Sequence, residues 1–263
     1  MRGALVAGSL LLLLGGCSFL YARLSYSFSP LPENEQIRYE AGAEDLAKRA
    51  AALLEPSLAE VEKRQLAPFK DRKAIRVYVF SDSNRYARFA HASVLTRASS
   101  STDEVYLSER LRERIDSLPG ILVHELSHVH LRQYTGTLGY VADIPGWFLE
   151  GLAVSTSGGA GAENVTASQA KAAIANGRSF RPDESGSIVG HKSAGDYGLE
   201  PHMYYRQAAL FVDYLRETDP GAFEATLLEI MHGGTFREAW PRRYGRTIPE
   251  LWRAFRGALQ SRA

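Results

Sequence analysis

Two histidines and a glutamate at close spacing are the residues of this chain best suited to chemistry. His124 and His128 lie four positions apart in an apolar stretch, and Glu125 directly follows the first of them. On an α-helix, positions four apart differ by about 40° around the axis, so both imidazoles reach one metal ion from one face. Glu125 is turned by about 100° from His124, where it can contact a water on the ion without binding the ion itself. The spacing predicts a metal site on this helix.

A third ligand has to come from another part of the chain. His130 lies two positions after His128, about 200° around the helix, and is predicted to be a surface or packing residue. Glu150, within the sequence WFLEGLA at residues 147–153, is the next candidate. Considered alone, a carboxylate at this position also fits a surface or helix-capping role. Two histidines and one carboxylate leave a fourth zinc position for water, as catalytic zinc sites do.

The sequence HELSH followed by WFLEGLA resembles the gluzincin branch of zinc metallopeptidases, in particular the peptidase-MA-like group with its W-x-x-E-G-x-A signature. This resemblance implies that His124, His128 and Glu150 bind Zn²⁺ and that Glu125 is the general base. It also implies hydrolysis of peptide bonds in a protein or peptide substrate. Residues 205–215 are similar to a further helix of that group.

Two more roles follow from the resemblance. Gluzincins use a Tyr or His after the third ligand to stabilise the oxyanion, and Tyr205 matches that place, with Tyr204 and His202 as alternatives. Thermolysin-like enzymes carry an Asp four residues after the third ligand to orient a zinc histidine, but an aliphatic residue stands there in this chain. Asp143 and Asp213 are the candidates for that orienting role.

The N-terminus has the pattern of an export signal. Arg2 precedes an uncharged apolar run at residues 4–14, which is shorter than the roughly 20 residues of a membrane-spanning helix. The sequence LGGC at residues 14–17 resembles the lipobox of bacterial lipoproteins, which implies that residues 1–16 are removed and that Cys17 carries lipid. The alternative is an ordinary signal peptide cut near residue 16, with Cys17 left as a buried thiol. In a Gram-negative bacterium, the resemblance implies the outer membrane, with the protein facing the periplasm.

The charge balance bears on the possible partners. Lys and Arg total 31 against 30 for Asp and Glu, which gives a formal net charge of +1. A dominant phosphate-binding surface requires a basic surplus, so nucleic acid is not an expected partner. The expected partners are a protein or peptide substrate and, through Cys17, a membrane.

The expected fold class is α+β. Strands are predicted at residues 74–80 and 104–108, and helices at residues 40–66 and 83–90, before a mostly helical C-terminal part. The resemblance implies a zincin-like fold with a small N-terminal sheet and an HExxH active-site helix. By analogy with such folds, residues 104–108 are expected to be the edge strand that pairs with substrate.

The remaining organisation follows from composition and periodicity. The later helices are predicted at residues 118–134, 147–157, 201–217, 222–231 and 248–260. A tether at residues 17–36 is expected to precede a single domain at residues 37–263. The long connection at residues 178–200 is expected to be functional or mobile.

Two functions of different classes fit these observations. The first is a zinc-dependent peptidase, lipid-anchored and acting on proteins or peptides of the cell envelope. The second is a lipoprotein of the same fold with a weak or inactive site, which serves as a binding or assembly factor. A structural zinc protein is disfavoured, because a structural site usually closes with a fourth protein ligand. Zinc content and cleavage activity, compared between the wild type and a Glu125 variant, distinguish the first two.

Overall fold

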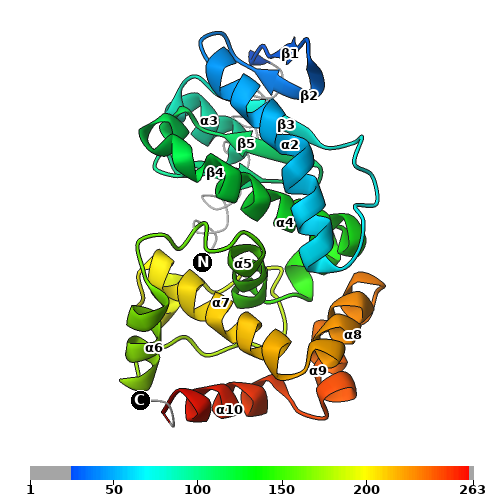
Figure 1. Ribbon diagram of the computed structural model, residues 1–263, viewed down its shortest axis with the longest axis vertical. Helices are drawn as coiled ribbons and strands as arrows, with labels where there is room; N and C mark the ends of the chain where they lie inside the picture. The colour runs from blue at the N-terminus through cyan, green and yellow to red at the C-terminus, as the bar shows by residue number, and fades with distance from the viewer. Residues whose placement is uncertain (1–24, 261–263) are drawn as a thin grey trace, which may run out of the picture. The chain divides into compact units, whose positions relative to one another are not determined.

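Residues 25–260 are described by the computed structural model, and they form two compact units (Figure 1). Of the described residues, the first unit contains 25–54 and 73–118, and the second contains 55–72 and 119–260. A small N-terminal mixed sheet with a mostly helical remainder confirms the α+β class. Cys17, the predicted signal peptide and the first part of the predicted tether lie outside the described residues.

A five-stranded sheet in the order β1-β2-β3-β5-β4 is the centre of the first unit. β2, β3 and β5 are parallel to one another, and β1 and β4 are antiparallel edge strands. On β3, Val77 and Val79 are fully buried and alternate with less buried Arg76 and Tyr78, as the two-residue period of a strand requires. The strands are β1 (Ser29–Leu31), β2 (Asn34–Tyr39), β3 (Arg76–Val79), β4 (Ala98–Ser100) and β5 (Glu104–Leu107).

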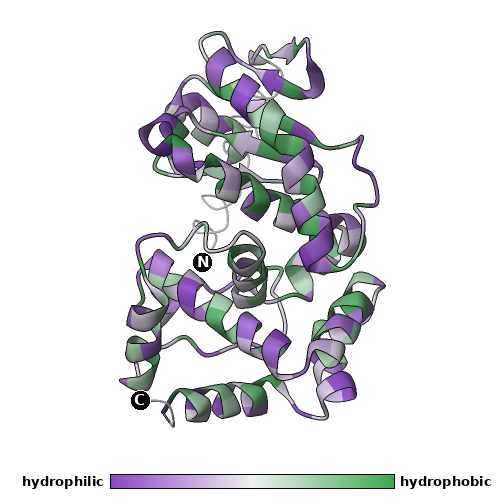
Figure 2. Ribbon diagram, in the orientation of Figure 1, coloured by the Kyte–Doolittle hydropathy of each residue, from purple (hydrophilic) through white to green (hydrophobic). Residues whose placement is uncertain are grey.

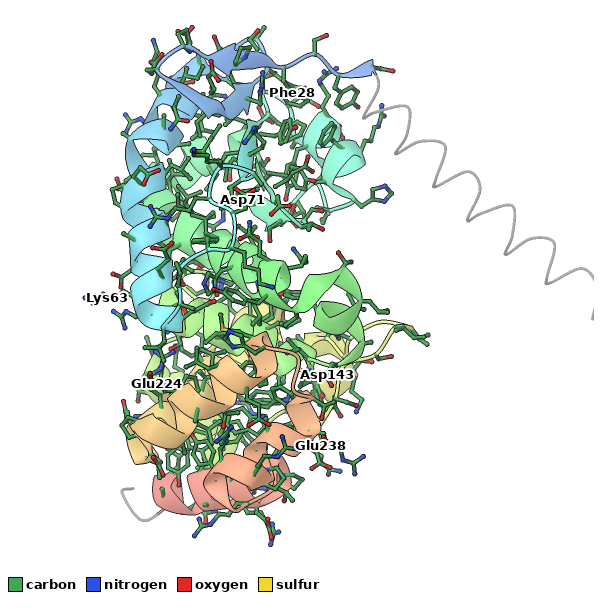
Figure 3. The ribbon with its side chains drawn as sticks, turned by 90° about the vertical axis from the view of Figure 1, so that its right-hand side faces the viewer. Phe28, Lys63, Asp71, Asp143, Glu224 and Glu238 are labelled. Atoms are coloured by element: carbon green, nitrogen blue, oxygen red, sulfur yellow. The ribbon has the colours of Figure 1, made fainter. Side chains whose placement is uncertain are left out.

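Aromatic side chains pack together in this unit. The ring of Phe28, labelled in Figure 3, lies with its centroid 5.0 Å from that of Tyr78 and 5.2 Å from that of Phe80. It also lies 5.3 Å from the ring of Phe89 on α3 (Ser83–Ala90). Edge-to-face arrangements of this kind stabilise beyond their buried area. Phe28 therefore fixes the chain just before β1.

Two features of the sheet differ from the sequence-based expectations. β5 lies between β3 and β4, so the expectation of an edge strand at residues 104–108 is wrong. The edge strand next to β5 is β4, which arises from a polar Ser/Thr segment without the apolar alternation that marks a strand. Residues 29–36, assigned to the tether, form β1 and the start of β2, and Leu31 is fully buried there.

Helices make up most of the second unit. α2 (Glu44–Gln65) begins in the first unit, is continuous through Pro56 and ends in the second. The seven helices that follow are α4 (Leu118–Ala142), α5 (Gly146–Thr156), α6 (Ala167–Ala175), α7 (Pro201–Thr218), α8 (Pro220–Met231), α9 (Phe236–Tyr244) and α10 (Ile248–Gln260). Short 3₁₀ helices occur at Glu109–Ser117 and Ala194–Tyr197. The sequence predicts five of the seven helices; α6, which is short, and α9, which contains Pro241, are additional.

An aromatic core stabilises this unit. Trp147 and Phe148 of α5, Phe211 of α7 and Trp240 of α9 are each at most 1% exposed. α5 is buried along most of its length, as expected for a central helix, whereas α7 and α10 carry both hydrophobic and hydrophilic residues (Figure 2). Within residues 25–260, no helix combines the length and the apolar character needed to cross a membrane.

α5 and α7 approach each other closely and lie side by side in Figure 1. A Cβ atom at Gly151 would lie only 2.8 Å from the carbonyl carbon and oxygen of Ala208 on α7. Only glycine allows this separation, because a larger side chain would meet backbone atoms that cannot move aside. The small residue at position 151 therefore serves the contact with α7.

Candidate metal centre

Three side chains from two helices converge in the second unit. His124 and His128 on α4 and Glu150 on α5 each offer one ligand atom, and these atoms all lie within 4.8 Å of one another. The two Nε2 atoms are 3.2 Å apart, and a Glu150 oxygen lies 3.5 Å from His124 Nε2 and 3.9 Å from His128 Nε2. Among residues 25–260, this is the only group of His, Cys, Asp and Glu with such a geometry. The structure thus brings together the three predicted ligands.

The spacing of these atoms suits a metal ion of the size of zinc. Tetrahedral zinc bound to nitrogen and carboxylate oxygen at about 2.0–2.2 Å holds its ligand atoms roughly 3.3 Å apart. The three separations here, 3.2, 3.5 and 3.9 Å, are close to that value. Two imidazoles and one carboxylate are also a donor set that zinc accepts in catalytic sites. The residues present therefore fit a metal ion.

The orientation of His124 is set by a loop that follows α5. Its Nδ1 lies 3.0 Å from the carbonyl oxygen of Ala160, and since a carbonyl only accepts, Nδ1 carries the proton and donates. The lone pair of Nε2 then faces Glu150 and His128. Gly161 lies against the same ring, because a Cβ there would be 2.9 Å from His124 Cε1. The main chain of this loop thus fixes both the tautomer and the position of the ring.

The orientation of His128 is set by a tyrosine from the far end of its own helix. The hydroxyl of Tyr140 lies 2.8 Å from His128 Nδ1, and both side chains are buried. On an unbroken helix, twelve residues separate two positions by about 18 Å along the axis, too far for this contact. α4 is broken at Gly136, with φ 68° and ψ 165°, and the chain returns Tyr140 to the histidine. The side chain of Arg132 lies over the Tyr140 ring, 4.1 Å from its centroid.

Charge in the cluster suits a cation. Burial tends to raise the pKa of the Glu150 carboxyl, but the nearby His124, His128 and His191 outweigh it, so that pKa is lowered and Glu150 stays ionised. Burial lowers the pKa of His128 to about 3, which keeps that imidazole neutral. His128 as a neutral imidazole and Glu150 as a carboxylate are thus in the forms that bind metal. For His124, burial lowers the pKa, but Glu150 and Glu125 outweigh it, so that pKa is raised.

Glu125 lies beside the three ligand residues without being one of them. It is 8% exposed, and its charge helps to raise the pKa values of His124, Tyr140 and Tyr205. Its carboxylate is therefore within electrostatic reach of the cluster, as the helix geometry predicts for a residue one position after the first histidine.

The three candidates for an oxyanion donor differ in their surroundings. The Glu150 carboxylate is the largest cause, ahead of burial, of the raised pKa of Tyr205, so this half-buried phenol is close to the cluster. Among residues 25–260, no group forms a hydrogen bond with its hydroxyl. The Tyr204 hydroxyl donates to the Lys192 carbonyl, and His202 lies 3.6 Å from a Glu163 carboxylate oxygen. Tyr205 is the best placed of the three.

The two aspartates suggested as orienting residues have other partners. Asp143 accepts a hydrogen bond from the Phe236 amide at 2.7 Å, and Asp213 accepts one from the Ser155 hydroxyl. The groups that contact the ligand histidines are instead the Ala160 carbonyl and the Tyr140 hydroxyl. A main-chain carbonyl has no sequence signal, and the role of Tyr140 depends on the helix break. Gly136, within an otherwise helical stretch, was the available hint.

His130 is a packing residue. It is fully buried, with Nδ1 2.6 Å from Gln65 Oε1 and Nε2 2.9 Å from the Ala67 carbonyl oxygen. Burial lowers its pKa to about 4. The packing alternative is therefore confirmed, and the surface alternative is wrong.

The connection at residues 178–200 packs against the beginning of α5. The indole nitrogen of Trp147 donates to the Asp183 carbonyl, and a Cβ at Gly146 would lie 3.0 Å from that of His191. His191 Nε2 donates to the Val141 carbonyl at 2.9 Å, and His191 is among the residues that lower the pKa of Glu150. The connection thus brings His191 near the cluster, which its sequence position did not suggest.

The arrangement can hold one metal ion and place an ionised carboxylate and a phenol beside it. A site of this kind can activate water for attack on a carbonyl. Comparison of the sequence with models of protein families finds no match, and comparison with curated proteins also finds none.

Proposed function

We propose that this chain is a zinc-dependent peptidase with a gluzincin-type site on a zincin-like fold. The observation that carries the proposal is the convergence of His124, His128 and Glu150 at separations suited to one zinc ion, with Glu125 beside them. These three residues hold the metal. When bound, zinc supplies Lewis-acid activation of a water molecule and of a substrate carbonyl.

Glu125 is the proton carrier in this proposal. As a carboxylate next to the ligand cluster, it takes the proton of the attacking water and later delivers it to the leaving amine. The contacts of the two histidines support this chemistry, because the Ala160 carbonyl and the Tyr140 hydroxyl hold the two Nδ1 atoms and leave the Nε2 atoms facing Glu150 for the metal.

Tyr205 is the proposed donor to the oxyanion. A raised pKa keeps its phenol protonated at neutral pH, so it can donate a hydrogen bond to a carbonyl oxygen that gains negative charge. Tyr205→Phe is expected to lower kcat by about 10²- to 10³-fold with little change in KM. Tyr204→Phe is the matched control, because its hydroxyl already donates to Lys192 and its loss should leave kcat within a few fold.

The proposal includes the cellular setting. Export, lipid attachment at Cys17 and a periplasm-facing position at the outer membrane are supported by the LGGC sequence after the apolar run. The proposed substrates are accordingly proteins or peptides of the cell envelope. Incorporation of labelled palmitate into the wild type, but not into Cys17→Ser, tests the attachment.

The central experiment measures zinc and cleavage together. Residues 18–263 are purified as wild type and as Glu125→Gln, bound zinc is quantified, and both proteins are incubated with a broad peptide library. We expect stoichiometric zinc in both proteins and cleavage only by the wild type, since the amide cannot accept the proton. Zinc without cleavage by the wild type would shift the function to a binding or assembly role. A wild type without zinc would overturn the metal site itself.

A further inference from the structure

The loop after α5 lies between the metal cluster and one side chain of α7. Its buried residue Ala160 offers the carbonyl that accepts the Nδ1 hydrogen of His124. The residues on either side are glycines in the left-handed region, Gly159 with φ 114° and Gly161 with φ 85°. Gly161 lies against the His124 ring, whereas Gly159 lies against the guanidinium of Arg206, where a Cβ would be 3.1 Å from both terminal nitrogens. Because both flanking residues are glycines, only the main chain of the loop and the small Ala160 side chain lie between Arg206 and His124.

Arg206 binds this loop through its main chain. Its Nε donates to the Val165 carbonyl at 2.9 Å, and its Nη2 donates to the carbonyls of Ala162 at 3.0 Å and Gly159 at 3.4 Å. Within residues 25–260, Arg206 forms no ion pair, so its charged donors are directed to carbonyl oxygens of one loop. Hydrogen bonds from a charged donor are roughly twice as strong as neutral ones. Three of them on residues 159–165 restrain the backbone on both sides of Ala160.

We propose that Arg206 is a positioning residue for the metal centre. By holding residues 159–165, it fixes the Ala160 carbonyl, which in turn fixes the Nδ1–H tautomer and the ring orientation of His124. This inference rests on the proposed metal site but assigns a further residue to it, one that touches neither the ion nor the ligands. Because outer contacts of this kind tune metal affinity, the loss of Arg206 should be measurable as weaker zinc binding.

The shape of the guanidinium is part of the inference. Its donors point in fixed directions in one plane, which lets a single side chain bind carbonyls from residues 159, 162 and 165. A lysine at this position keeps the charge but offers one compact ammonium group. Arg206→Lys is therefore expected to behave more like Arg206→Gln than like the wild type.

Zinc affinity is the first test. Dissociation constants are measured by chelator competition for the wild type, Arg206→Gln, Arg206→Lys and Gly159→Ala. We expect zinc affinity to fall by about 10- to 100-fold in all three variants. The two Arg206 variants lose hydrogen bonds to the loop, and in Gly159→Ala the added methyl group would push against the guanidinium. Cobalt in place of zinc should show altered absorption bands in the same variants, because the His124 ligand is no longer held in one orientation.

Arg216→Gln is the matched control. Arg216 lies on the same helix, is largely buried over the Phe223 ring and binds the Ser155 side chain on α5, not the loop. This variant is expected to melt at a lower temperature but to bind zinc with wild-type affinity. Equal losses of affinity in the Arg206 and Arg216 variants would mean a general loss of stability and would overturn the inference.

A metal-free readout separates this inference from the proposed function. In the apoprotein, nuclear magnetic resonance of the histidine side chains reports whether the Nδ1 hydrogen of His124 is bonded and protected from exchange. We expect protection in the wild type and its loss in Arg206→Gln. Zinc affinity and protection within twofold of the wild type in Arg206→Gln would overturn the inference. A wild type that binds no zinc would overturn the proposed function, and the protection measurement would still decide the role of Arg206.

Discussion

α4 carries three buried histidines, which form two sets according to the groups that their ring nitrogens face: His130 alone, and His124 with His128. In His130, both nitrogens face oxygen atoms of the protein, from Gln65 and Ala67. In His124 and His128, Nδ1 faces the Ala160 carbonyl or the Tyr140 hydroxyl, whereas the two Nε2 atoms converge on each other and on the Glu150 carboxylate. All three are buried and lie within seven residues. What distinguishes the candidate ligands from the packing histidine is therefore that their Nε2 atoms face one another and Glu150, whereas His130 Nε2 faces a main-chain carbonyl.

The largest expected difference between the two sets is in metal content. His128→Gln removes a ligand, so we expect loss of stoichiometric zinc and of all activity. His130→Gln should keep zinc and activity but lower the free energy of unfolding by about 1–3 kcal/mol, because it disturbs buried hydrogen bonds. Metal analysis and denaturant unfolding of both variants check this. Loss of zinc from both His128→Gln and His130→Gln would contradict the comparison, because it would show that the orientation of the Nε2 atom does not decide which histidine binds the metal.

A smaller difference is expected between two tyrosines of α4. Tyr140→Phe removes the hydroxyl at His128 Nδ1 and should weaken zinc binding by about 10- to 100-fold. Tyr134→Phe is the matched control, because its hydroxyl donates to the Pro68 carbonyl near His130. That variant should leave zinc affinity unchanged. Chelator competition measures both, and equal affinities for wild type and Tyr140→Phe would remove Tyr140 from the metal centre.

The smallest expected effect concerns the segment that supplies the Ala67 carbonyl. Glu62 accepts hydrogen bonds from the Phe69 amide and from Arg72, and Arg72 is the main cause of its lowered pKa. A carboxyl whose folded pKa is lowered stabilises above its unfolded value, 4.5, and this contribution is lost as the pH falls through the folded pKa. Since Arg72 is 38% exposed, the contribution should be below about 1 kcal/mol.

Melting curves between neutral and acidic pH provide the measurement for Glu62. The wild type should lose slightly more stability than Glu62→Gln as the pH falls below 4.5, and zinc binding at neutral pH should be the same in both. A larger loss of stability at acidic pH in Glu62→Gln than in the wild type would contradict a lowered pKa for Glu62.

The sequence singled out the three residues of the candidate metal site because their signal is local or tied to a recognisable motif. A spacing of four on an apolar helix is enough to place His124 and His128 on one face, and the sequence around Glu150 pointed to the third ligand. The buried strand β3 was equally clear from its β-branched and aromatic residues. The edge strand β4 was missed because a short polar strand is stabilised by its neighbour β5, which sequence periodicity cannot show.

The contacts that orient the ligands were the least accessible from sequence. The Ala160 carbonyl belongs to the backbone, so any residue type could provide it. In the sequence, Arg206 is an ordinary polar residue of an amphipathic helix. Only the fold shows that it binds the loop after α5. Asp143 and Asp213 were suggested because carboxylates usually fill the orienting role, but their side chains are used to hold other helices.

The helix break at Gly136 predicts which residues of this site are conserved together in related sequences. A Cβ at Gly136 would meet no atom within 4 Å, so substitution is opposed by its φ of 68° and not by crowding. A substitution at Gly136 that straightens the helix would carry Tyr140 away from His128. Without that contact, a tyrosine at position 140 would have no role at the metal centre and would not be conserved. We expect related sequences to keep or lose Gly136 and Tyr140 as a pair. H-E-x-x-H followed by seven residues, Gly, three residues and Tyr would then be a longer signature than H-E-x-x-H alone.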